Sequence, residues 1–149
     1  MDRRNVMGAL GAGFVTLEQL VAQHQHGGAS SGKKPWVGYE PRFFTRDQYA
    51  VLEAVCERIL PRDAESPGAA DVGVAYYLDT VCHYQPAMPR DLLRAGLEAL
   101  RTQSFAAAGE AAQIRMLETL AAQERNPKSE LERFFVTIKR LTIEAWALS

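Results

Sequence analysis

Apolar residues recur through most of the chain at steps of three and four positions, the spacing of a helix with one buried face. The first such stripe consists of Tyr49, Leu52, Cys56, Ile59 and Leu60. Thr45 and Gln48 have the spacing of a capping box at its start. Pro61 lacks the amide that would continue the helix. We therefore expect a helix that begins after Thr45 and ends before Pro61.

Two more helices are predicted from stripes of their own. One covers residues 69–83, and its apolar face consists of Val74, Tyr77, Leu78 and Val81. The polar segment from Arg62 to Gly68 joins it to the helix before. The next begins at Pro89, because a proline in the first turn gives up only an amide that would be unpaired there. Its apolar face consists of Leu92, Leu93, Gly96, Leu97, Leu100 and Phe105.

The last third of the chain adds two helices. After a soft break at residues 106–109, one begins near Glu110 and ends before Pro127. Its side chains expected to point inward are Ile114, Leu117 and Leu120. Ser129 and Glu132 form a second capping box, which opens a helix with an apolar face of Phe134, Phe135, Ile138, Leu141, Ala145 and Trp146. No run alternates apolar and polar residues as a strand does, so we predict an all-α fold of about five short helices around one core.

The N-terminal third differs in composition from this helical part. Arg3 and Arg4 precede an apolar run of about twelve residues, which is the layout of a twin-arginine export signal. The run is shorter than the ~20 residues that a membrane-spanning helix needs. An ordinary amphipathic N-terminal helix with two basic residues would show the same pattern. We divide the chain into a signal segment at residues 1–22, a linker at 23–43 and a helical domain at 44–149.

The linker is rich in glycine, serine and lysine and cannot bury enough apolar surface to order itself. Four aromatic residues at its end are exceptions, namely Trp36, Tyr39, Phe43 and Phe44. Aromatic side chains in a polar connector usually pack on another surface. That surface is either the chain's own helices, which is the default, or a partner subunit. Arg62 and Pro67 are further candidates for a partner contact, although a preorganised connection between helices would use the same residues.

Two cysteines, Cys56 and Cys82, fall on the first two predicted helices. They could pair in an oxidising compartment. In a simple antiparallel hairpin, however, the rise of ~1.5 Å per residue would separate them by on the order of 10 Å along the axis, which is too far for a disulfide. Two separate buried thiols are slightly favoured. The spacing is neither that of a CxxC redox pair nor that of a CxxCH haem attachment site.

Charge and motifs give little sign of chemistry in this chain. The net charge is −1, with 17 basic and 18 acidic residues interspersed, so no electrostatic footprint for nucleic acid is present. The sequence contains no helical Glu-x-x-His pair, nucleophile elbow or phosphate loop. Asp71 and Asp79 lie eight residues apart and could pair as acids, but a capping or solvated role is more usual. We expect no catalytic, cofactor-binding or metal-binding residue.

Five short motifs form a set that spans the helical domain. They are Arg58-Ile59-Leu60-Pro61, Ser66-Pro67-Gly68-Ala69 with Asp71 and Val74, Tyr77-Leu78-Asp79, Phe134-Phe135 and Leu141-Thr142-Ile143. Together with the twin-arginine start, this set resembles the gluconate 2-dehydrogenase subunit 3 family. The motifs describe a scaffold and not a reaction centre.

The resemblance implies a non-catalytic small subunit of a periplasmic, FAD-dependent sugar or sugar-acid dehydrogenase complex of the glucose-methanol-choline (GMC) type. In that role Arg3 and Arg4 address the twin-arginine translocon, and the chain escorts and stabilises the catalytic subunit. FAD then belongs to the catalytic partner, and a cytochrome c subunit with haem c is a further expected partner. The alternative is a free-standing all-helical binding or regulatory module that needs no flavoprotein.

Overall fold

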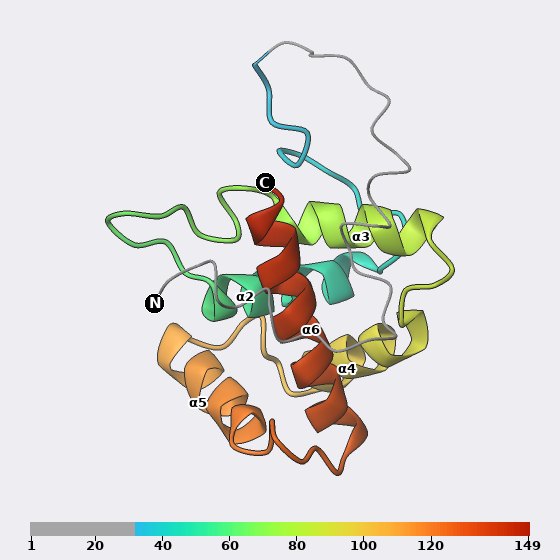
Figure 1. Ribbon diagram of the computed structural model, residues 1–149, viewed down its shortest axis with the longest axis vertical. Helices are drawn as coiled ribbons and strands as arrows, with labels where there is room; N and C mark the ends of the chain where they lie inside the picture. Colours follow the sequence, from blue (N-terminus) through green and yellow to red (C-terminus); the bar gives the residue numbers. More distant parts are fainter. Residues whose placement is uncertain (1–31) are drawn as a thin grey trace.

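The computed structural model describes residues 32–149, in which five α-helices form the fold (Figure 1). In chain order they are α2 (Arg46–Ile59), α3 (Val74–Tyr84), α4 (Arg90–Thr102), α5 (Glu110–Ala121) and α6 (Glu130–Ala147). This part of the chain contains no strand, so the all-α prediction is confirmed. The predicted signal segment lies outside the described residues.

Both predicted capping boxes are present. At the start of α2, Thr45 Oγ1 accepts a hydrogen bond from the Gln48 amide at 3.1 Å, and Gln48 Oε1 accepts one from the Thr45 amide at 3.2 Å. Ser129 and Glu132 make the same reciprocal pair at the start of α6. Each box satisfies two amides that have no partner within the helix. These two helix starts were therefore predictable from four side chains.

The helix predicted over residues 69–83 begins later than expected, at Val74. The residue before it, Gly73, has a left-handed backbone with φ of 71°, which a continuing helix does not allow. A Cβ atom on Gly73 would overlap the Trp36 ring, so glycine is required here for two reasons. Hydrophobic spacing could not show this boundary, because the contact that sets it comes from the linker.

Helices α2 and α6 are central to the packing, since each contacts the other four helices of the described chain. In Figure 1, α6 runs down the middle of the molecule, with α3 across its upper end and α4 and α5 below. The largest fully buried side chains include Leu52, Leu78, Leu93, Leu97, Leu100, Phe105, Phe134, Ile138 and Leu141. Complete burial of such a side chain contributes ~1.5–3 kcal/mol, so this core is the main source of stability.

Helix α5 turns two of its three predicted inward side chains, Leu117 and Leu120, toward the core but not the third. Leu117 is buried as expected, but Ile114 is 38% exposed. Gln113 is buried instead, and its Nε2 donates a hydrogen bond to the Phe105 carbonyl at 2.9 Å. A buried acceptor thus draws a polar side chain inward. The prediction for Ile114 was wrong because apolar spacing takes no account of such an acceptor.

One buried carboxylate fixes the end of the linker to the helices. Asp79 of α3 is fully buried and accepts four hydrogen bonds. The donors are the Tyr39 hydroxyl at 2.6 Å and the backbone amides of Arg42 at 2.8 Å, Phe43 at 3.1 Å and Phe44 at 2.9 Å. A carboxylate without water needs such replacement donors. Four hydrogen bonds that hold residues 39–44 on α3 therefore converge on one side chain, and we call this arrangement the Asp79 clamp.

Asp79→Asn should lower the free energy of unfolding by about 2–4 kcal/mol, because the amide group would face donors that need an acceptor. Urea unfolding measures the loss, and hydrogen exchange should show faster exchange at the amides of Arg42, Phe43 and Phe44. Asp91→Asn, an exposed change on α4, is the matched control and should cost less than about 1 kcal/mol. Equal unfolding midpoints for the two variants would contradict the clamp.

Burial, together with the hydrogen bond to Asp79, raises the pKa of Tyr39 to about 12. An unfolded tyrosine has a pKa of about 10, so the folded state favours the neutral phenol. The stability that this preference contributes is fully present below pH ~10 and is lost as the pH rises through ~12. Tyr39→Phe should therefore show a shallower loss of stability over that pH interval than wild type, as measured by urea unfolding at a series of pH values. Identical slopes would argue against the hydrogen bond from the partly buried Tyr39 hydroxyl to Asp79.

Gly96→Ala should destabilise the contact between α4 and α6, because a Cβ atom there would overlap the Phe134 ring. Overpacking of this kind costs about 1–3 kcal/mol, which outweighs the ~1 kcal/mol of helix propensity that alanine gains. The urea midpoint should fall accordingly. Gly32→Ala, at a site with no atom within 4 Å of the new Cβ, should leave the midpoint unchanged.

Candidate functional site

The structure packs all four aromatic residues of the linker end against the chain's own helices. Phe44 is only 4% exposed and belongs to the core. Phe43 is half-buried beneath two guanidinium groups of α4, with Arg94 at 3.9 Å and Arg90 at 5.3 Å from its ring centroid. Such cation–π contacts fix the ring where it reaches the surface. Arg42 adds a hydrogen bond from Nη1 to the Tyr84 hydroxyl at 2.8 Å.

The other two linker aromatics join two tyrosines from the helices. Trp36 lies 6.4 Å from Tyr76, Tyr76 lies 4.7 Å edge-to-face from Tyr39, and Tyr39 lies 5.8 Å from Tyr49, all between ring centroids. We call these four residues the aromatic cluster. Trp36 and Tyr39 were candidates from the sequence. Tyr76 was not, because nothing in its local sequence indicates that the linker would cover it.

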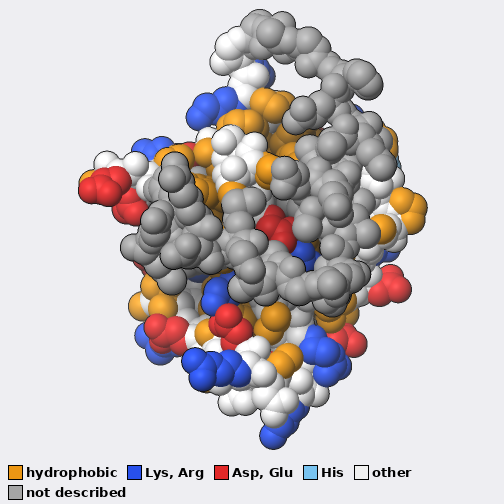
Figure 2. Space-filling view, viewed as in Figure 1, with side chains coloured by type: hydrophobic (Ala, Val, Ile, Leu, Met, Phe, Trp, Pro, Cys, Tyr) orange, Lys and Arg blue, Asp and Glu red, His pale blue; other side chains and the backbone are white. Residues whose placement is uncertain are grey.

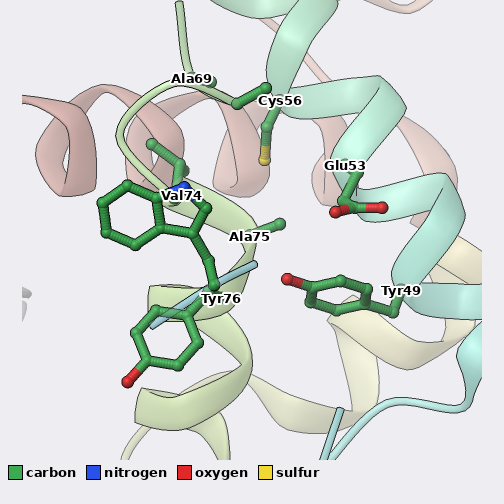
Figure 3. A pocket seen from close by; sticks show the side chains of 10 residues that line it. Tyr49, Glu53, Cys56, Ala69, Val74, Ala75 and Tyr76 are labelled. Atoms are coloured by element: carbon green, nitrogen blue, oxygen red, sulfur yellow. The ribbon is translucent and has the colours of Figure 1, made fainter. Parts of the chain in front are cut away.

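The aromatic cluster lines a hollow between α2, α3 and the linker, which we call the aromatic hollow (Figure 3). An inner cavity of about 40 Å³ and a more open outer part of about 300 Å³ share Trp36, Tyr49 and Glu53 as lining residues. In Figure 3 the side chains of Tyr49, Glu53 and Cys56 project from α2 toward α3. The hollow therefore combines aromatic rings with a carboxylate and a hydroxyl.

Two polar side chains of the hollow, Tyr49 and Glu53, have no hydrogen-bond or ion-pair partner within residues 32–149. The Tyr49 side chain is only 8% exposed, and its hydroxyl makes no hydrogen bond there. Glu53 lies at the accessible rim, and neither a hydrogen bond nor an ion pair engages its carboxylate. Partial burial raises the pKa of Glu53, and burial together with the nearby Glu53 carboxylate raises that of Tyr49.

A second candidate surface is the connection between α2 and α3, which includes the predicted contact residues Arg62 and Pro67. Arg62 forms an ion pair with Asp71, and its Nε lies 2.7 Å from Asp71 Oδ2. Asp71 also accepts a hydrogen bond from the Gly68 amide at 2.8 Å, and these contacts, led by Arg62, lower the pKa of Asp71 to about 2. Trp146 of α6 donates a hydrogen bond from Nε1 to the Pro67 carbonyl at 2.9 Å. The connection is thus anchored at both its ends.

The tip of this connection carries negative charge. Asp63 Oδ1 accepts hydrogen bonds from the amides of Glu65 at 2.8 Å and Ser66 at 2.7 Å, which closes a tight turn. Figure 1 shows the connection projecting from the left side of the molecule, and Figure 2 shows acidic side chains gathered at that edge. The projecting segment is therefore both stiff and acidic.

Asp71 and Asp79, considered as paired acids from the sequence, have separate structural roles. Asp71 holds Arg62, whereas Asp79 holds the linker. Residues 32–149 contain no group of three or more side chains that could hold a metal ion, either around these two aspartates or elsewhere. None of the described helices is long and apolar enough to cross a membrane.

The two cysteines are both buried and free. Cys56 Sγ lies 3.4 Å from Thr142 Oγ1 of α6 and not against Cys82. Burial raises the pKa of each thiol to about 12, which keeps both protonated and unreactive near neutral pH. The structure thus has two separate buried thiols, which is the alternative that the sequence slightly favoured. Arg3 and Arg4, the predicted export residues, lie outside the described part of the chain.

Comparison with known proteins identifies the helical domain. The family model described as gluconate 2-dehydrogenase subunit 3 matches residues 46–149, from the first residue of α2 to the last residue of the chain. No curated protein and no solved structure shows a significant match. Because the family match covers more than half of the sequence, and confirms the resemblance drawn from its motifs, the chain belongs to the gluconate 2-dehydrogenase subunit 3 family, an accessory subunit of a dehydrogenase complex.

Proposed function

We propose that this chain is the non-catalytic small subunit of a periplasmic, FAD-dependent dehydrogenase complex of the GMC type, which oxidises a sugar or sugar acid. The family match over residues 46–149 carries the proposal, because the family is described as subunit 3 of gluconate 2-dehydrogenase. FAD and the substrate then belong to the catalytic subunit. A cytochrome c subunit, with its haem c, receives the electrons.

Export is the second part of the proposed role. Arg3 and Arg4, followed by a short apolar run, have the layout of a twin-arginine signal, and that pathway carries folded proteins. A catalytic subunit that has folded around FAD can therefore leave the cytoplasm bound to this chain. The small subunit then remains attached and stabilises its partner by binding the folded state.

Two rigid surfaces support the role of a binding subunit. The connection between α2 and α3 presents Arg62 and Pro67 with little conformational freedom to lose on binding, and the Asp79 clamp does the same for Tyr39 and Phe43. Surfaces that are ordered before binding avoid much of the entropy cost of association. Phe44 supports this interface from the core and does not form part of it.

The proposal predicts that a tagged chain recovered from the native periplasm brings down a flavoprotein, detected by flavin absorbance in the eluate. Arg3→Lys combined with Arg4→Lys should leave both proteins in the cytoplasm, because the translocon requires the arginine pair. Comparison of flavin content in periplasmic and cytoplasmic fractions measures the effect.

Lys33→Arg combined with Lys128→Arg is the matched control, since it makes two conservative basic changes at exposed positions outside the signal. It should leave the distribution of the flavoprotein unchanged. A wild-type chain that reaches the periplasm but elutes alone and without flavin would overturn the proposed function and favour a free-standing helical module.

A further inference from the structure

The Glu53 carboxylate lies at the exposed rim of the aromatic hollow and forms no ion pair in residues 32–149. It lies beside the rings of the aromatic cluster, whose faces carry partial negative charge and attract cations. A partner that covers this carboxylate would remove the water that solvates it, and that loss costs free energy unless the partner supplies a counter-charge. An acidic side chain that lies at an aromatic wall and has no ion pair in residues 32–149 is therefore a site at which a positive group of a partner would be stabilised twice, by the carboxylate and by the rings.

The cations near the hollow already have other partners. Lys34 Nζ lies 5.5 Å from the Trp36 ring centroid and donates a hydrogen bond to the Asp71 carbonyl at 3.2 Å. Arg46, at the outer rim, forms an ion pair with Glu40 at 2.9 Å. Neither forms an ion pair with Glu53 in the described part of the chain.

A second polar group of the hollow, the Tyr49 hydroxyl, suits the same kind of ligand. The Tyr49 hydroxyl opens into the inner cavity from a side chain that is more than nine-tenths buried, and it has no partner within residues 32–149. A hydroxyl oxygen accepts hydrogen bonds, as the carboxylate does. An ammonium group has three hydrogens to donate and no acceptor, so it matches this pair of groups.

The size of the hollow selects among cationic side chains. The inner cavity of about 40 Å³ is large enough for a water-sized group, and an ammonium group is of that size. The outer part of about 300 Å³ has room for an alkyl stem against the rings of Trp36 and Tyr39. A planar guanidinium group is a poorer fit to so small an inner cavity.

We infer that the aromatic hollow binds a lysine side chain of the catalytic subunit, with its ammonium group between Glu53 and the Tyr49 hydroxyl and its stem against the aromatic cluster. The inference rests on the proposed function, because it names the chemistry of one contact with that partner. It makes Glu53 a residue that specifies the partner, and not one that stabilises the free chain.

The first test uses the isolated full chain and n-butylammonium as a mimic of the lysine side chain. The sequence contains two tryptophans, so a nitrogen–proton correlation spectrum resolves two indole signals. The Trp36 signal should shift saturably with n-butylammonium, while that of Trp146, which donates a hydrogen bond to Pro67, should stay in place. n-Butanol at equal concentration should have a much smaller effect. Equal shifts with n-butanol would show a merely apolar hollow and overturn the inference.

Variants of two glutamates supply the matched comparison. Glu53→Gln should weaken n-butylammonium binding at least about tenfold, since it removes the counter-charge. Glu118→Gln, an exposed change on α5, should not alter it. Both variants should keep the wild-type urea midpoint. A lower midpoint for Glu53→Gln would show a structural role and count against the inference.

The same variants then test the complex with the catalytic subunit. Glu53→Gln should weaken capture of the flavoprotein at least about tenfold relative to Glu118→Gln. Equal capture by the two variants would overturn the inference while the proposed function stands. Failure of the wild-type chain to capture any flavoprotein would overturn the proposed function, and the inference with it.

Discussion

The buried Asp79 carboxylate is the interaction on which the candidate site depends. By accepting one hydroxyl and three amide hydrogen bonds from the linker, it turns residues 39–44 from a polar connector into part of the folded domain. The position of the Tyr39 ring follows, and with it one wall of the aromatic hollow. The opposite wall depends on Gly73, because only a residue without a Cβ atom leaves room for Trp36. One carboxylate and one glycine thus shape a surface that spans three segments of the chain.

In the connection between α2 and α3, side chains also hold the backbone in place through hydrogen bonds. Asp71 holds Arg62 and the Gly68 amide, and Trp146 holds the Pro67 carbonyl. Two aspartates that the sequence offers as potential acids are both used to position backbone. An accessory subunit gains from this arrangement, because its contact surfaces are ordered before the partner arrives and lose little entropy on binding.

The features of this structure that could be predicted are those set by residues close together in the sequence. The capping boxes at Thr45 and Ser129 were readable because each is made by residues three apart. The start of α3 at Val74, the inward turn of Gln113 and the Asp79 clamp were not, since each depends on groups that lie outside the helix concerned. The aromatic linker residues could be expected to pack somewhere, but Glu53 reads as an ordinary solvated position on α2. Its role is visible only once the linker closes the hollow beside it.

One aromatic ring at the surface of this chain has its cationic partners within the same chain. Phe43 has Arg90 and Arg94 over it, so that contact is complete within the subunit. The aromatic hollow has four rings and a carboxylate, yet Glu53 has no cationic partner in residues 32–149. A partner that covers this hollow would strip water from an unpaired carboxylate, and a cation on that partner would offset the cost. The contrast between these two neighbouring surfaces is the reason to regard the first as part of the fold and the second as part of a complex.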